Sequence, residues 1–161
     1  MNLTISKEQI INGLQAVQNV VSSRTTLPIL SNVLMRAEGD RIEFTATDLD
    51  VTIACSVEAK VKKTGVSTVP VKKLFGIVRE LNGKEIEIEV DEKNTCAIRC
   101  GASFYKIHGL SADEFPPLPK FKDEKKITIP QETAKAMLQM IGATVQTNYS
   151  NPNAKKAPPK K

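Results

Sequence analysis

The stretch from residue 2 to residue 21, NLTISKEQIINGLQAVQNVV, joins a short alternating segment to a helical one and sets the pattern for the rest of the chain. Residues 2–6 alternate as a short strand does. Ser6 is suited to cap a helix, because its hydroxyl can accept a bond from a free backbone N–H group. The residues that follow place their apolar side chains at helical spacing on one face. The sequence therefore predicts a strand followed by a helix near 7–22.

Three strand-like segments follow this helix, at about 29–38, 41–47 and 51–59. In the middle segment every second residue is apolar, which is typical of an antiparallel strand with one buried face. The same order then begins again: a strand at 66–69 ends at a proline, and a helix is expected at 71–81. The further strands are expected near 85–91, 95–100 and 103–108.

A third start is visible at 128–130. Thr-Ile-Pro at that point repeats Thr-Ile-Ser at 4–6 and Thr-Val-Pro at 68–70, and another helix is expected near 131–143. The repeating unit is a strand, a helix and three strands, about sixty residues in all. Two such units side by side predict an α+β fold with two helices on antiparallel sheet. The alternative is that many α+β domains show such an order by chance.

Composition restricts the class of protein further. The chain is 40% hydrophobic but only 4% aromatic, with no tryptophan, so aliphatic side chains must fill the core. Three cysteines at irregular spacing form a poor disulfide framework. No signal peptide or membrane-spanning run is visible. We expect a reduced, cytoplasmic protein that does not enter a membrane.

Charge is distributed unevenly along the sequence. The net charge is +5, and no acidic residue lies between residues 60 and 79, where six basic residues occur. The predicted strand at 85–91 instead carries acids at every second position. We therefore expect a neutral to basic helical layer and an acidic sheet layer, and a phosphate backbone would favour the former. The alternative is that both faces are merely solvated. The polar residues expected on the exposed side of the first helix are Asn12, Gln15, Asn19 and Ser22.

Residues that could carry catalysis or bind a metal form no recognisable constellation. His108 is the only histidine and has no nucleophile motif near it. Asp48 and Asp50 are too few for a metal site and suit a turn. Cys96 and Cys100 are expected to be buried thiols. We predict no catalytic residues, no metal and no cofactor.

Four segments carry a resemblance to a known family: RTTLPILSNVL at 24–34, TDLD at 47–50, VPVKKLF at 69–75 and GLSADEFPPL at 109–118. In order and spacing they resemble bacterial sliding clamps, the beta subunit of DNA polymerase III, from residue 1 to about 143. The resemblance implies the DNA-clamp fold and a ring of two chains, with helices lining the hole and sheets outside. It implies a non-catalytic processivity factor on duplex DNA, with polymerase and clamp-loader subunits as partners.

The resemblance also assigns roles to positions. By position, the family's DNA contacts fall on Arg24 and Lys72, with Lys73 and Arg79 as further candidates on the same helix. The ring-closing contact is expected on the second helix and a nearby strand. Family members often carry arginine near that strand, where this chain has Ala102 and Phe104, so the contact should be more apolar. The residues expected in it are Lys73, Ile77, Leu81 and Tyr105.

The chain is short relative to the family. We expect a clamp N-terminal domain at 1–120, an incomplete start of a second domain at 121–145, and a disordered Lys/Pro tail at 146–161. The parts that bind partner peptides and close the ring should be missing. The alternative function is that of an interaction module or remnant that binds an intact clamp and does not tether DNA.

Overall fold

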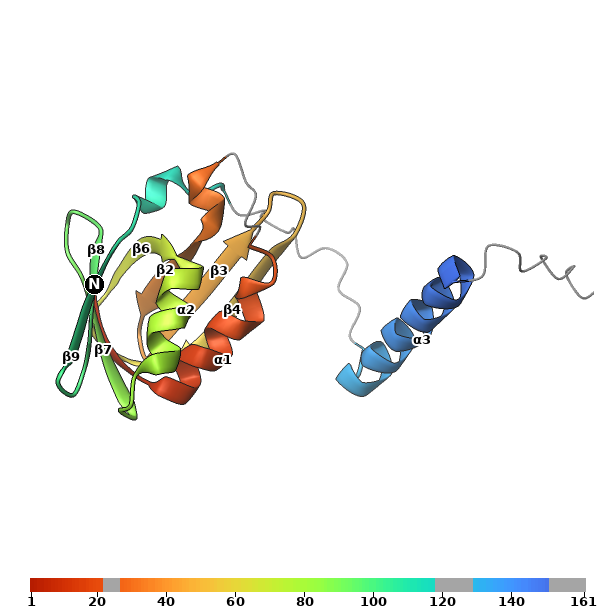
Figure 1. Cartoon of the computed structure of the whole chain (residues 1–161), viewed down its shortest axis with the longest axis horizontal. Coiled ribbons are helices and arrows are strands. Elements are labelled where there is room, and N and C mark those ends of the chain that lie inside the picture. The colour runs from red at the N-terminus through yellow and green to blue at the C-terminus, as the bar shows by residue number, and fades with distance from the viewer. Residues whose placement is uncertain (22–26, 118–128, 151–161) are drawn as a thin grey trace, which may run out of the picture. The chain divides into compact units, whose positions relative to one another are not determined.

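The computed structural model describes residues 1–21, 27–117 and 129–150, with side chains described up to residue 140 (Figure 1). Contacts divide the chain into two compact units, Met1–Leu118 and Pro119–Lys161. The elements of the first unit are β1 (Asn2–Ser6), α1 (Lys7–Gln18), the 3-10 helix η1 (Pro28–Ser31), β2 (Asn32–Glu38), β3 (Arg41–Thr47), β4 (Thr52–Glu58), β5 (Lys60–Lys63), β6 (Gly65–Pro70), α2 (Val71–Glu80), β7 (Glu85–Val90), β8 (Thr95–Cys100), β9 (Ser103–His108) and the 3-10 helix η2 (Ala112–Glu114).

The described elements of the first unit follow the predicted order, and their main differences from the prediction are as follows. Helix α1 ends at Gln18 and not near 22, and its last turn tightens as Val20 N–H bonds the carbonyl of Val17. The segment expected as a strand from residue 29 begins as η1, since the fixed φ angle of Pro28 suits the first position of a helix. Strand β5 was not predicted, because its sequence KVKK contains a single apolar residue.

The two repeated units exchange their first strands. One sheet has the order β5-β1-β7-β8-β9 and the other β4-β3-β2-β6, with antiparallel pairing throughout both. Strand β1 of the first unit pairs with β7 of the second, placing Leu3 opposite Ile88. Strand β6 of the second unit pairs with β2 of the first, placing Val33 opposite Val69. Neither unit therefore completes a sheet without the other.

Helices α1 and α2 lie side by side over the sheets (Figure 1). Aliphatic side chains from both helices and both sheets form one core. Gly13 lets α1 approach β3, because a Cβ there would stand 2.7 Å from Cδ2 of Phe44. Residues that are completely buried in this core include Leu3, Ile10, Leu14, Val17, Leu74, Val78, Ile86 and Ile88.

Lys7 ties the start of α1 to the end of α2. Its Nζ donates to the carbonyl of Arg79 at 2.8 Å and to that of Leu81 at 2.5 Å. Its backbone N–H donates to the carbonyl of Lys84 at 2.7 Å. The last carbonyls of a helix have no partner within the helix, so the Lys7 ammonium supplies one and also opposes the negative end of the helix dipole.

The segment after β9 is fixed to β6 through one buried threonine. The Oγ1 atom of Thr68 donates to the carbonyl of Leu110 at 2.8 Å and accepts from Nδ2 of Asn32 at 3.0 Å and from the Leu110 N–H at 3.2 Å. Gly109 is required beside it, because any Cβ would collide with the Thr68 carbonyl. A small second core closes over the same segment, formed by Ile29, Leu30, Leu34 and Phe115.

The second unit contains α3 (Gln131–Ser150), which is longer than predicted. Residues 146–150 are helical, and the expectation that they lack regular structure is wrong. The reason is that no helix breaker follows Gly142 until Pro152, which disfavours helix at the residue before it. Residues 151–161 of the expected tail lie outside the described residues. Ile129 and Pro130 form no strand, since a strand requires a paired neighbour.

Candidate nucleic-acid interface

Helix α1 presents a polar side to solvent. The hydroxyl of Ser6 accepts the N–H of Gln9 at 3.2 Å and caps the helix as predicted. Asn12, Gln15 and Asn19 are exposed, whereas Ser22 lies outside the described residues. These spacings of three and four residues place the three side chains on one helix face. The face therefore offers uncharged hydrogen-bonding groups.

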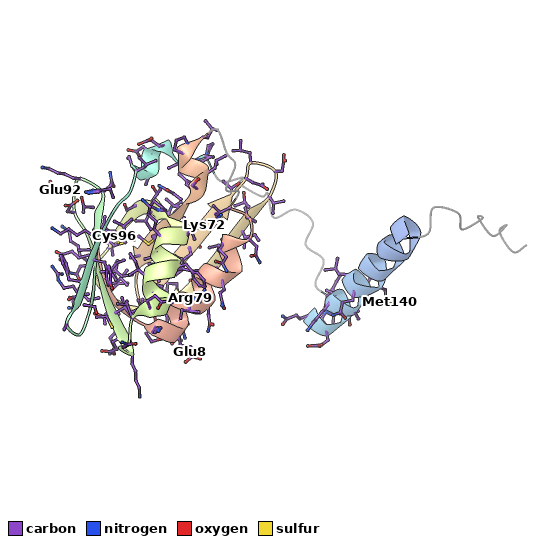
Figure 2. All side chains as sticks on the ribbon, viewed as in Figure 1. Glu8, Lys72, Arg79, Glu92, Cys96 and Met140 are labelled. Atoms are coloured by element: carbon purple, nitrogen blue, oxygen red, sulfur yellow. The ribbon has the colours of Figure 1, made fainter. Side chains whose placement is uncertain are left out.

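Helix α2 presents cations beside that face. Lys72, Lys73 and Arg79 are all exposed, and none forms an ion pair within the described part of the chain. Lys72 and Arg79 are nearly two turns apart, about 10 Å along the helix axis, and lie toward opposite ends of α2 (Figure 2). The Arg79 guanidinium lies over the Phe75 ring, 5.9 Å from its centroid. Together the two helices carry four basic and two acidic residues.

Three lysines of the basic stretch are not on the helices. Lys60, Lys62 and Lys63 form most of β5, and two of them reach across β1 to carboxylates of β7. Lys60 lies 3.6 Å from Glu85 and Lys62 lies 3.1 Å from Glu87. The expected contrast between a basic helical layer and an acidic sheet layer is therefore wrong for this sheet, which carries paired charges. In the sequence these lysines lie close to the residues of α2. In the structure β5 pairs with β1, so the lysines belong to the five-stranded sheet.

Arg24, the first of the expected DNA contacts, lies outside the described residues. The candidates for the subunit contact divide into two groups. Lys73 is exposed, Ile77 is half-buried and Tyr105 is 41% exposed, on α2 and β9, two elements that contact each other. Leu81 is only 2% exposed and belongs to the core, so it offers no surface to a partner.

The exposed face of β9 places an aromatic ring beside two cations. Phe104 is 50% exposed, with the Arg99 guanidinium 5.1 Å and the Lys106 ammonium 5.6 Å from its ring centroid. Arg99 stands on β8 directly opposite Phe104 and also pairs with Glu89 at 3.0 Å. The neighbouring strand thus supplies an arginine whose charge is already paired with Glu89, and the expectation of a more apolar subunit contact stays a prediction.

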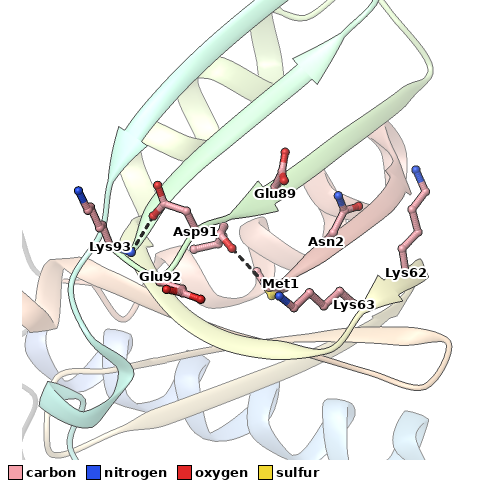
Figure 3. A pocket seen from close by; sticks show the side chains of 9 residues that line it. Met1, Asn2, Lys62, Lys63, Glu89, Asp91, Glu92 and Lys93 are labelled. Carbon is pink, nitrogen blue, oxygen red and sulfur yellow. Dashed lines mark hydrogen bonds between the residues drawn. The ribbon is translucent and has the colours of Figure 1, made fainter.

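A groove beside the N-terminus is lined by three lysines and three carboxylates (Figure 3). The terminal amine of Met1 donates to the carbonyl of Val90 at 3.0 Å and so extends the pairing of β1 with β7. Asp91 closes the adjacent turn by accepting the N–H groups of Lys93 and Thr95. These hydrogen bonds, that from Thr95 above all, lower the pKa of Asp91. The walls of the groove are therefore held by the pairing of β1 with β7 and by the turn that Asp91 closes.

The remaining polar candidates have structural roles. Asp48 accepts the N–H groups of Asp50 and Val51 and closes the β3–β4 turn, as predicted. Cys96 and Cys100 are buried, also as predicted. Among the described residues no group of three His, Cys, Asp or Glu side chains could hold a metal ion. No helix in the described ranges is long and apolar enough to cross a bilayer.

Two intertwined strand–helix units, with paired helices over two antiparallel sheets, define the DNA-clamp fold. A family model described as the N-terminal domain of the DNA polymerase III beta subunit matches residues 1–119. The chain therefore belongs to the DNA polymerase III beta subunit family, the bacterial sliding clamps.

Relatives and solved structures agree with this membership. The beta sliding clamp of Chlamydia muridarum is 33% identical over 93% of this chain and 41% of its own length, and that of Bacillus subtilis is 30% identical over 94% and 42%. The crystal structure of the Bacillus subtilis clamp superposes with a TM-score of 0.81 at 31% identity, covering 86% of this chain and 39% of that one. The Caulobacter crescentus clamp gives 0.71 at 37% identity, covering 74% and 33%. The chain thus spans about two fifths of the length of the curated relatives quoted.

Proposed function

We propose that this chain is part of a sliding-clamp processivity factor, which holds duplex DNA without sequence specificity and catalyses no reaction. The observation that supports it is the exposed face of α1 and α2, where Lys72, Lys73 and Arg79 stand free of carboxylate partners among the described residues. Phosphate groups are the natural counterions of such a face. Few exposed aromatic or base-reading groups accompany these cations, which favours sequence-blind contact.

The proposed DNA contacts are Lys72, Lys73 and Arg79 on α2, with Arg24 preceding η1. About four phosphate contacts give a slope of roughly −3 to −4 in a plot of log K against log salt concentration. Such a surface should bind duplex with a Kd near 10⁻⁴ M or weaker at physiological salt. Weak contacts suffice in a closed ring, since topology retains the DNA. We propose that it acts in the cytoplasm, where the replication machinery binds chromosomal DNA.

Charge reversal on α2 tests this function. Lys72→Glu with Arg79→Glu should abolish the binding of a fluorescent duplex, measured by anisotropy at about 20–200 mM salt. The matched control is Lys60→Glu with Lys62→Glu, which makes the same change in net charge on the sheet face and should retain most of the binding. Equal losses in the two variants would mean that only net charge matters, and would sink the proposal.

Two further variants complete the experiment. Arg24→Glu alone tests the position before η1, and should reduce both the affinity and the salt slope. Replacing the four tail lysines (155, 156, 160 and 161) with glutamine separates any contribution of the tail from that of the helices. If the tail variant loses all binding while the α2 reversal loses none, the helical face is not the DNA site.

A second candidate function is supported by the exposed edge of β9. Phe104 and Tyr105 leave apolar surface beside Arg99 and Lys106, a combination suited to another clamp protomer with apolar and acidic groups. In this alternative the chain binds an intact clamp and does not tether DNA. Native mass spectrometry of the chain with a full-length clamp tests it. A mixed complex that is lost on Phe104→Glu, together with no DNA binding, would favour it over the first proposal.

A further inference from the structure

A glycine occupies the centre of the exposed face of α2. Gly76 lies four residues after Lys72 and three before Arg79, so all three share one side of the helix. A Cβ placed on Gly76 would meet no atom within 4 Å in the described part of the chain. The position faces open solvent, nearly opposite the buried stripe of Val71, Leu74 and Val78.

Neither packing nor backbone geometry explains this glycine. Gly76 has ordinary helical dihedral angles, unlike Gly39 and Gly101, whose φ angles are positive. Glycine inside a helix costs roughly 0.5–1 kcal/mol relative to alanine. At Gly13 that cost has a visible reason, because Phe44 occupies the space of a Cβ. At Gly76 no atom of the described residues occupies it.

We propose that Gly76 is the place where a phosphodiester backbone lies against α2, an inference that rests on the proposed DNA-holding function. Without a side chain the helix surface is recessed between Lys72 and Arg79. These residues are about 10 Å apart along the axis, close to the rise of three nucleotides of one strand. A backbone seated over Gly76 is therefore within reach of both cations at once.

On the side of α2 that carries Lys72, Gly76 and Arg79, the neighbouring groups favour phosphate over a protein partner. Four charged residues surround Gly76 on the exposed side, of which Lys72, Lys73 and Arg79 are cations and Glu80 is the one acid. Protein contacts instead depend on apolar or aromatic anchors in the centre of the interface. Phe75 is half-buried and holds the Arg79 guanidinium over its ring, so that this cation is already ordered before phosphate binds. A bulky residue at position 76 would hold a duplex away from one of the two cations.

Adding bulk without charge tests the proposal. Gly76→Leu should weaken duplex binding about three- to tenfold at 50 mM salt and reduce the salt slope by about 0.9, the value of one phosphate contact. Gly76→Ala should weaken it less. Both residues form helix better than glycine, so circular dichroism should show melting temperatures equal to or above that of the unmodified chain. Ala54→Leu, which adds similar bulk on the sheet face away from the helices, should leave binding unchanged.

The outcomes separate this inference from the function it rests on. If Gly76→Leu binds DNA like the unmodified chain while the Lys72/Arg79 reversal abolishes binding, the inference is overturned and the proposed function stands. If the reversal itself has no effect, both are overturned. A second readout is the backbone amide of Gly76 in a ¹⁵N-labelled chain titrated with duplex. The Gly76 amide signal should shift together with those of Lys72 and Arg79, whereas the Gly39 amide, in the β2–β3 turn, should not shift. A Gly76 signal that stays fixed while DNA binds refutes the proposed contact between Gly76 and the phosphodiester backbone.

Discussion

Replacing Lys7 with methionine should destabilise the first unit by about 1–2 kcal/mol. The ammonium donates to two carbonyls at the end of α2, at 2.8 and 2.5 Å. Hydrogen bonds to a charged group contribute about 1.5–3 kcal/mol, and a cation at a helix C-terminus adds about 0.3–1 kcal/mol. Ordering a lysine side chain costs up to about 2 kcal/mol, and the partial exposure of Lys7 weakens the electrostatic part. The balance is favourable but modest.

Thermal and urea unfolding followed by circular dichroism measure this effect. A loss of about 1.5 kcal/mol should lower the melting temperature by roughly 5–8 °C in a unit of this size. The control is Lys84→Met, which removes the same charge from an exposed side chain that has no partner in the described part of the structure. If Lys7→Met and Lys84→Met unfold at the same urea concentration, the ammonium does not stabilise the helix end, and the reasoning fails.

Three other predictions concern buried or hydrogen-bonded groups. Thr68→Val should cost about 2–3 kcal/mol in urea unfolding, because it leaves buried polar groups without partners, whereas Thr68→Ser should cost clearly less. The pKa of Asp91 is lowered mainly by the Thr95 backbone bond, so this carboxylate stabilises the fold above its ordinary pKa and that stability is lost as pH falls through the lowered one. Asp91→Asn should therefore make the unfolding midpoint less sensitive to pH below about pH 4, and an unchanged acid profile would contradict this. Burial raises the pKa of Cys96 to about 12, so a thiol reagent at about pH 8 should label half-buried Cys55 first and Cys96 only after unfolding, as counted by mass spectrometry.

Local pattern determined most of the elements. Strands β3, β8 and β9 have the predicted bounds, and α2 ends one residue before its predicted end. The reason is physical: alternation and helical spacing are properties of neighbouring residues, and the core selects them directly. The family was equally visible, since its motifs are contiguous. The roles of Lys72 and Arg79 on DNA remain proposals, as does the role of Arg24.

Pairing between distant segments is what only the tertiary structure decided. No local pattern shows that β1 joins β7 or that β6 joins β2, because strand partners are chosen by packing across the whole core. This strand pairing places Lys60 and Lys62 on a sheet, where they form ion pairs, and not beside the helices. The packing of α2 on the sheets also buries Leu81 and leaves Gly76 exposed to solvent. The sequence thus determined which segments are helix and strand, whereas contacts between residues far apart in the chain decided which side chains face solvent together.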